Sequence, residues 1–349
     1  MKKEFPSLCV LGLALVFQIP AFSAMAPKLT VGNQTFSAAT GAMNFTNCCA
    51  TASYVAGSGF TLHFWGDSVL NYPNRMTVIE TTQSAPLTIV LDTGIDVIVR
   101  AKYCGVSCPG DLTIKGAGTF EVLTTSGSLL ETDDAIHCSG DFTAILGVTV
   151  NVGKQGDTIR FSEGKGIYAG GELKFEVAFG NIAGKADSLL YGRKGVKIMA
   201  SMLNLWQDWG EGKAYANPAV KAVGGGVTIQ GSVLSLLSQG DAVFADNGGE
   251  VFIAQSCAVV VSYGHCFSAF PRISFSECNV TAVSGVGSAI SIAGAKDRPY
   301  GYYYDDSGNG GGSTHRLSFI WERDGIILVR EMLRLRFWEV GVRLWKMQM

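Results

Sequence analysis

A segment that begins with glycine and continues as a short run of alternating apolar residues recurs along most of this chain. It reads Gly-Asp-Leu-Thr-Ile-Lys-Gly at 110–116, Gly-Asp-Phe-Thr-Ala-Ile-Leu-Gly at 140–147 and Gly-Gly-Val-Thr-Ile-Gln-Gly at 225–231. An internal period of about 20–50 residues indicates stacked units, because each unit can bury its apolar face only against its neighbours. The chain is therefore expected to form a solenoid.

The leading apolar positions of seven copies define the repeat. Their separations are 30, 31, 23, 31, 24 and 22 residues, which indicates a unit near 22–24 residues with insertions in some turns: Leu112, Phe142, Leu173, Val196, Val227, Val251 and Ile273. Most copies are preceded by a small residue and an apolar one, at Ala135-Ile136, Ser188-Leu189, Ala219-Val220, Ala242-Val243, Cys266-Phe267 and Ala289-Ile290. Each unit thus carries three short β runs of period two, separated by turns.

Three strands per unit predict an all-β fold, a single-stranded right-handed parallel β-helix of about seven or more coils. Each coil would pair with the next at about 4.8 Å, and inward side chains would alternate with outward ones. The right-handed winding follows from the rule for parallel crossovers. Small residues are expected at one corner and glycines, with positive φ, at the other. A β-propeller would need four strands in about 40–45 residues.

The N-terminal residues are typical of a secretory signal peptide. Met1-Lys2-Lys3 is followed by an apolar run from Leu8 to Phe17 and by small residues up to Ala24. Residues 1–24 are therefore predicted to be removed, and the protein is predicted to be secreted or at the cell surface. Residues 25–84 are expected to form an N-terminal cap over the open end of a β-helix at 85–295.

The C-terminal residues do not follow the repeat. Residues 296–314 are a Gly- and Tyr-rich linker, and residues 315–349 form an irregular tail rich in Arg, Trp and Leu with loosely helical spacing. Three interpretations stay open for this tail: a capping helix, a segment that faces a membrane or a partner, or a frameshifted end of the gene.

Composition narrows the classes of partner. The net charge of −2 implies no general attraction to nucleic acid or anionic lipid. No later stretch is long and apolar enough to predict a membrane span. The eight cysteines after residue 24 predict structural disulfides or buried thiols rather than a metal site, and no cofactor is expected. Cys257 and Cys278, about one coil apart, are expected to stack on adjacent turns.

One motif carries a resemblance to a known family. The segment Asp133-Asp134-Ala135-Ile136-x-x-Ser139-Gly140-Asp141-Phe142, with counterparts at Asp241-Ala-Val and Gly248-Gly-Glu-Val-Phe-Ile, resembles secreted bacterial right-handed β-helix proteins labelled carbohydrate-binding-domain-containing, which have a pectin-lyase-like fold. The resemblance covers roughly residues 85–295. It implies sugar binding at cell surfaces or among users of polysaccharides, although its motifs are mostly turn and core residues.

The paired aspartates Asp133 and Asp134 are also similar to those of polygalacturonase-type hydrolases. The Asn-x-Asp, Gly-His-Gly and Arg-x-Lys motifs of those enzymes are missing from this sequence. Both residues are therefore interpreted as turn aspartates that bond neighbouring backbone amides. No catalytic residue is predicted.

An insertion at 206–217 is the predicted carbohydrate-binding site. It contains Trp206, Trp209 and Tyr215 beside acidic and basic residues. Aromatic faces could stack on sugars there, or the rings could instead fold down and cover the side of the rod. We therefore expect an exported, non-catalytic protein that binds a polysaccharide or a cell-surface glycan. The alternatives are a polysaccharide-degrading enzyme and a structural or adhesin-like rod.

Overall fold

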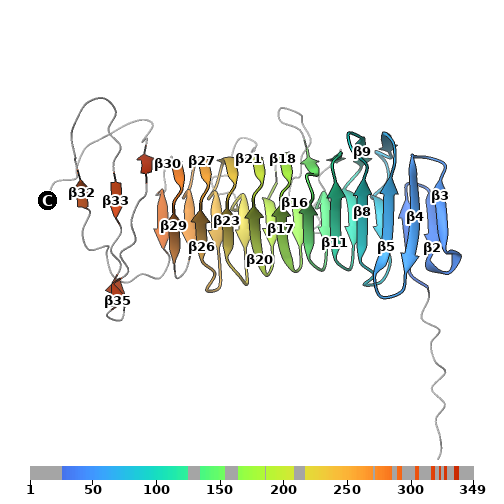
Figure 1. The fold of residues 1–349 in the computed structure, drawn as a ribbon, viewed down its shortest axis with the longest axis horizontal. Coiled ribbons are helices and arrows are strands. Elements are labelled where there is room, and N and C mark those ends of the chain that lie inside the picture. Colours follow the sequence, from blue (N-terminus) through green and yellow to red (C-terminus); the bar gives the residue numbers. More distant parts are fainter. Residues whose placement is uncertain are drawn as a thin grey trace, which may run out of the picture.

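The computed structural model is a rod of stacked β coils (Figure 1). It describes residues 26–124, 134–153, 164–184, 186–207, 217–269, 272–284 and 289–292, together with five short strands after residue 302. Each coil adds one strand to each of three long sheets, here called sheets A, B and C. The described residues form nine such coils, which confirms the predicted parallel β-helix.

The parallel part of sheet B consists of β5 (Gly59–Phe64), β8 (Leu87–Leu91), β11 (Leu112–Gly116), β14 (Phe142–Ile145), β17 (Glu172–Glu176), β20 (Gly195–Met199), β23 (Val227–Gln230), β26 (Val251–Ala254) and β29 (Ile273–Ser276). The matching strands of sheet C are β6 (Ser68–Asn71), β9 (Asp96–Ala101), β12 (Thr119–Thr124), β15 (Thr149–Val152), β18 (Phe179–Gly184), β21 (Met202–Gln207), β24 (Val233–Ser238), β27 (Cys257–Ser262) and β30 (Asn279–Ser284). Those of sheet A are β7 (Thr77–Thr81), β10 (Cys104–Cys108), β13 (Ile136–Cys138), β16 (Lys165–Ala169), β19 (Ser188–Gly192), β22 (Val220–Ala222), β25 (Val243–Ala245), β28 (Phe267–Ala269) and β31 (Ile290–Ile292).

The predicted leading positions are in register through sheet B. The pairs run in order from Leu112 with Phe142 to Val251 with Ile273, and all seven side chains are buried. They face one continuous core that includes neighbouring phenylalanines, such as Phe142 and Phe175, whose ring centroids are 5.8 Å apart and whose planes are tilted by 51°. Alternation of period two therefore predicts which side chains point inward.

The register of sheet A departs from the prediction at one coil. Leu190, not Leu189, pairs with Val220, so Leu189 takes the position that Ala219 has in the next coil. The cause is a local bulge, because the amides of Leu189 and Leu190 both donate to the carbonyl of Ala219, at 2.8 and 2.9 Å. The predicted pair Ser188-Leu189 is wrong by one residue.

The corner between sheets B and C uses left-handed backbone in most coils. In four coils the residue there is glycine, at Gly94, Gly116, Gly147 and Gly231, with φ of 76°, 120°, 84° and 59°. Four other coils have a larger residue with positive φ, at Val177, Ala200, Gln255 and Glu277, with φ of 51°, 48°, 49° and 49°. The expectation of glycine at this corner is thus confirmed in the first group of coils and wrong in the second. Stacked amide-to-carbonyl bonds hold the turns, for example from Ala200 to Gln230 at 2.9 Å and from Gln255 to Ser276 at 2.9 Å.

Antiparallel strands cover the N-terminal end of the rod. They are β1 (Lys28–Val31), β2 (Gln34–Ser37), β3 (Ala42–Phe45) and β4 (Ala50–Val55), with the 3-10 turn η1 (Ala38–Thr40) between β2 and β3. β1 pairs with β7, and β4 pairs with β5. Parallel stacking starts at β5, where Phe60 is in register with Leu87, and so begins before residue 85.

The described C-terminal residues are strands. They are β32 (Tyr303–Asp305), β33 (Arg316–Ser318), β34 (Glu322–Arg323), β35 (Ile326–Ile327) and β36 (Arg334–Phe337), and β36 extends sheet C by pairing with β30. The helical spacing seen in this tail does not produce a helix at these residues. Among the residues described, no helix meets the length and apolarity that a membrane crossing requires. The predicted signal peptide lies outside the described residues.

Candidate functional site

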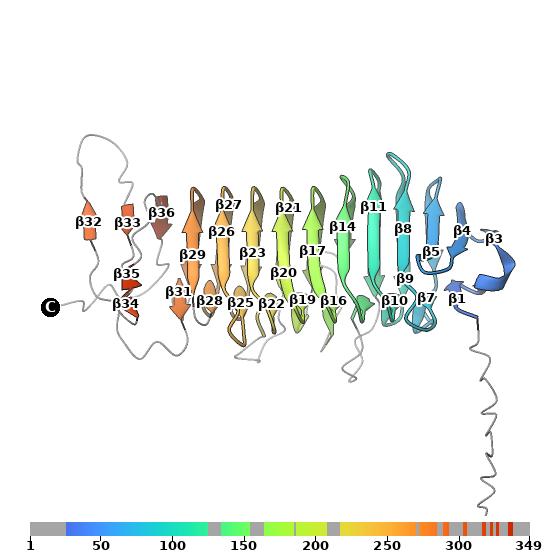
Figure 2. The same ribbon diagram turned by 60° about the horizontal axis from the view of Figure 1, so that its bottom comes forward.

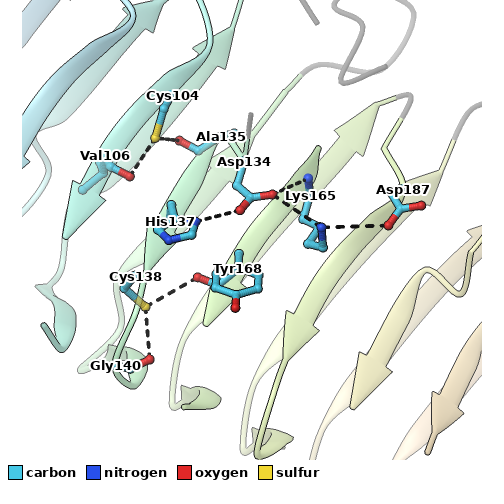
Figure 3. Close-up of polar contacts among 10 residues, drawn as sticks. All are labelled: Cys104, Val106, Asp134, Ala135, His137, Cys138, Gly140, Lys165, Tyr168 and Asp187. Carbon is cyan, nitrogen blue, oxygen red and sulfur yellow. Dashed lines mark hydrogen bonds and ion pairs between the residues drawn. The ribbon is translucent and has the colours of Figure 1, made fainter. Parts of the chain in front are cut away.

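The longest connections of the β-helix all fall in the same type of turn, from sheet C to sheet A. They follow β12, β15 and β21, and include residues 125–133, 154–163 and 208–216, which lie outside the described residues. The chain re-enters the described structure at Asp134, Gly164 and Asn217. The strands of sheet A run along the lower side of the rod in Figure 2. A group of polar side chains gathers along this edge of the sheet (Figure 3).

Asp134 is the centre of this group. Its side chain is 1% exposed, and both carboxylate oxygens have partners (Figure 3). Oδ1 accepts a hydrogen bond of 2.8 Å from the backbone amide of Lys165, one coil further along. Oδ2 lies 2.8 Å from Nδ1 of His137. Because a carboxylate only accepts hydrogen bonds, the proton of neutral His137 is placed on Nδ1, and Nε2 is left as an acceptor.

Lys165 lies between two carboxylates and two aromatic rings. Its Nζ is 4.0 Å from Asp134 Oδ1 and 4.0 Å from Asp187 Oδ2. The same atom is 5.8 Å from the ring centroid of Tyr168 and 5.2 Å from that of Tyr191, distances at which a cation attracts an aromatic face. Only 15% of its side chain is exposed. Through Asp134 and Asp187, the ammonium group links side chains from three successive coils.

His137, Tyr168 and Tyr191 form a stack of parallel rings on the outer face of sheet A. They hold equivalent positions in β13, β16 and β19. The centroids of His137 and Tyr168 are 4.6 Å apart with planes at 9°, and those of Tyr168 and Tyr191 are 5.3 Å apart at 14°. The next position is Lys221, whose Nζ lies 5.9 Å from the Tyr191 centroid. This group is called the His137–Tyr168–Tyr191 stack below.

The stack presents ring edges rather than ring faces. Each inner face is covered by the neighbouring ring, so a ligand meets Nε2 of His137 and the two phenol groups. Burial, followed by the neighbouring Tyr168, raises the pKa of the Tyr191 phenol, which keeps it a hydrogen-bond donor. The site therefore offers donors and acceptors in a row along the rod.

Other turn aspartates share one of the two contacts of Asp134, the hydrogen bond to a backbone amide of the next coil. Asp111 accepts from the amide of Asp141 at 2.8 Å, and Asp241 accepts from the amide of His265 at 2.7 Å. The interpretation of Asp134 as a turn aspartate is confirmed by its bond to Lys165, while Asp133 lies outside the described residues. What distinguishes Asp134 is the second oxygen, which holds His137.

The predicted carbohydrate-binding residues are only partly described. Trp206 is 39% exposed on the outer face of sheet C, in register with Ala183 and Leu237. Trp209 and Tyr215 lie outside the described residues. Trp206 thus belongs to a different face of the rod from the His137–Tyr168–Tyr191 stack. The sequence did not predict this stack.

Gln207 anchors the insertion that follows Trp206. It is fully buried, and its Nε2 donates to the carbonyls of Ala186, Asp187 and Asn217 at 3.0, 3.2 and 3.1 Å. Its Oε1 accepts from Ser238 at 2.7 Å. The side-chain amide therefore satisfies two carbonyls of the preceding coil and one at the C-terminal end of the insertion.

None of the described cysteines forms a disulfide. All eight described cysteines are free, and five of them are buried. Cys257 and Cys278 do not stack as predicted, because Cys257 points outward in register with Asn279 while Cys278 points inward. Cys108 and Cys138 are the pair in register, in β10 and β13. Burial raises the pKa of both thiols, so neither is a ready nucleophile.

The described residues contain no group of three His, Cys, Asp or Glu side chains placed to hold one metal ion. A shallow hollow of about 380 Å³, lined by residues that include Thr51, Thr61 and His63, lies on the outer face of sheet B, away from the stack. Comparisons with protein-family models, with curated proteins and with solved structures gave no match.

Proposed function

We propose that this protein is an exported, non-catalytic β-helix that binds a glycan, and that the His137–Tyr168–Tyr191 stack with Lys165, Asp187 and Lys221 is the binding surface. The observation that carries the proposal is the stack itself, a row of polar ring edges held in parallel over three coils. The sequence resemblance to secreted carbohydrate-binding β-helix proteins supports the same class of ligand.

A row of this kind suits a linear polymer of hydroxyl groups. Successive coils are spaced by about 4.8 Å, so the positions from His137 to Lys221 span roughly 14 Å. The phenols and the lysines donate hydrogen bonds, whereas His137 Nε2 and Asp187 accept them. Sugar hydroxyls can do both, so they match this set of groups. Because the side chains stand on paired strands, little conformational entropy is lost when a ligand binds.

The test is a screen of the protein against a glycan array, followed by titration of the best ligand. Replacing Tyr168 and Tyr191 together by Phe removes both hydroxyls but keeps the stack, and binding should fall at least about tenfold for two lost hydrogen bonds. Phe244 follows Lys221 in the same row and already lacks a hydroxyl, so Phe244→Leu is the matched control and should bind as the parent does.

The same titration separates the two candidate sites. Trp206→Ala removes the described part of the site that was predicted from sequence. If this variant loses binding while the double Tyr→Phe variant keeps it, the site lies on sheet C and the assignment to the stack is wrong.

A second function is favoured by the contact of Asp134 with His137. A histidine held at Nδ1 by a buried carboxylate can accept a proton at Nε2, as a general base does. A reducing-end assay on acidic and neutral polysaccharides tests for cleavage. Turnover that His137→Gln abolishes would replace glycan binding by polysaccharide degradation as the function.

A further inference from the structure

The outer face of sheet C between β18 and β30 is the apolar face of the rod. Its exposed side chains include Phe179, Met202, Val233, Val259 and Val261, with exposures of 47%, 45%, 45%, 51% and 37%. Trp206 lies on the same face at 39%. Monomeric soluble proteins rarely expose an apolar patch of more than a few hundred Å² without a partner for it. This group of strands is called the sheet C face below.

The sheet C face carries no charged side chain on its five described strands. The outward residues of its middle row are Asn181, Asn204, Ser235, Val259 and Thr281. The amide of Asn204 donates to Asn181 at 2.9 Å, so even these polar groups are partly paired within the sheet.

The other two sheets differ from the sheet C face. Sheet B has the ion pairs Lys174–Glu176 and Lys197–Glu172 on its outer face, and sheet A has Lys165 between Asp134 and Asp187. Two identical faces without charge can meet in any orientation without repulsion between like charges. Such a face also has no group that would select a charged partner.

Cys257 is an independent sign that the sheet C face is covered. Of the eight described cysteines it is the exposed one, and it lies between Val233 and Asn279 in the first row of this face. An exposed free thiol in an exported chain is normally paired or shielded, because it is otherwise open to oxidation.

We propose that two copies of this chain associate through the sheet C face, with Cys257 shielded in the interface. Five strands about 4.8 Å apart and six residues about 3.3 Å apart give roughly 480 Å² per copy, or about 1,000 Å² in total. That area lies at the lower limit for a specific interface, where association is weak, and about 1 μM is taken as the working dissociation constant. The proposal is independent of the glycan site, which lies on sheet A.

Sedimentation of the full secreted chain between about 0.1 and 100 μM tests the proposal, since this range brackets the expected dissociation constant. The mass should rise from monomer to dimer over this range. Val259→Glu should keep the chain monomeric, and Val233→Lys provides a second disruption if the first variant folds poorly. Val55→Glu is the matched control, because Val55 is 60% exposed in the cap hairpin, and it should dimerise as the parent does.

Alkylation of Cys257 with a maleimide gives an independent readout. At about 100 μM the parent should be alkylated about tenfold more slowly than the Val259→Glu variant, because most of the chain is then dimeric. If the parent chain stays monomeric at about 100 μM, the proposal is overturned. Slow alkylation of Cys257 in that monomer would mean that another segment of the same chain covers the sheet C face. Loss of glycan binding in Trp206→Ala without any change in mass would make the face a sugar-binding surface instead.

Discussion

Replacing Asp134 by Asn is expected to reverse the tautomer of His137 while leaving the β-helix intact. The amide of Lys165 can only donate, so the side-chain oxygen of the introduced asparagine must take the place of Oδ1 and its NH2 group must face His137. His137 Nδ1 then has to accept, and the ring proton moves to Nε2. The group that a ligand meets at His137 changes from an acceptor to a donor.

The cost to stability follows from the two bonds of Asp134. Each is a hydrogen bond to a charged group, worth about 1.5–3 kcal/mol, so Asp134→Ala should lower the free energy of unfolding by about 3–6 kcal/mol. Asp134→Asn keeps both bonds in neutral form, at roughly half their strength, and should cost about 1.5–3 kcal/mol. Asp241→Asn is the matched control, because Asp241 bonds the amide of His265 and has Phe244 in the place of His137.

Urea unfolding measures the stability of the three variants, and two-bond 1H–15N correlation spectra at neutral pH report which imidazole nitrogen carries the proton. We expect the His137 signals to exchange their pattern in Asp134→Asn and to stay unchanged in Asp241→Asn. Glycan binding should weaken only in the former. An unchanged His137 tautomer in Asp134→Asn would refute the account of how this site is oriented.

Three further predictions concern the rod itself. Phe142→Ala should cost about 3–5 kcal/mol and speed hydrogen exchange in β14 and β17, whereas the outward Phe252→Ala should cost little. Burial raises the pKa of the Cys266 thiol to about 12, so its contribution to stability is complete below about pH 8.5 and is lost, by about 1.4 kcal/mol per pH unit, as the pH rises towards the folded-state pKa. Cys266→Ala should reduce the slope of stability against pH between about pH 8.5 and 10 by this amount, and the other buried thiols, such as Cys108 and Cys138, should keep part of the slope. Ser232→Ala removes the acceptor for the buried amide of Ser201, at 3.2 Å, and should cost about 1–3 kcal/mol in urea unfolding, unlike Ser235→Ala on the exposed face.

The stacking order of the coils could be predicted because the same inward positions repeat in sequence. Leu112, Phe142 and Leu173 follow turns that contain glycine or aspartate, and the period-two pattern after each turn leaves one choice of face. The extent of the N-terminal cap could not be predicted in the same way. Phe60, Leu62 and Phe64 alternate as the repeats do, but no Gly-Asp turn precedes them.

Part of the polar stack is hidden in the sequence by one residue of register. If Ser188-Leu189 is aligned with Ala219-Val220, strict alternation would place Tyr191 inward, whereas the structure buries both Leu189 and Leu190. The bulge at these two leucines, opposite Ala219, places Tyr191 on the outer face, directly after Tyr168. A bulge depends on which amide reaches which carbonyl in the next coil, and that information is not contained in local hydrophobicity. Once the register is known, His137, Tyr168 and Tyr191 are each the residue after an inward apolar one.

The three faces of the rod can differ because the core alone sets the fold. Most inward positions are apolar or small, Gln207 being an exception, and this requirement places no restriction on the residues that alternate with them. Sheet B uses its outward positions for ion pairs, sheet A for the His137–Tyr168–Tyr191 stack and sheet C for uncharged, mostly apolar side chains. Binding of a ligand on sheet A and association through sheet C therefore do not compete for the same surface. A dimer joined through sheet C would display two stacks, and a polymer long enough to reach both would bind more tightly than either stack alone.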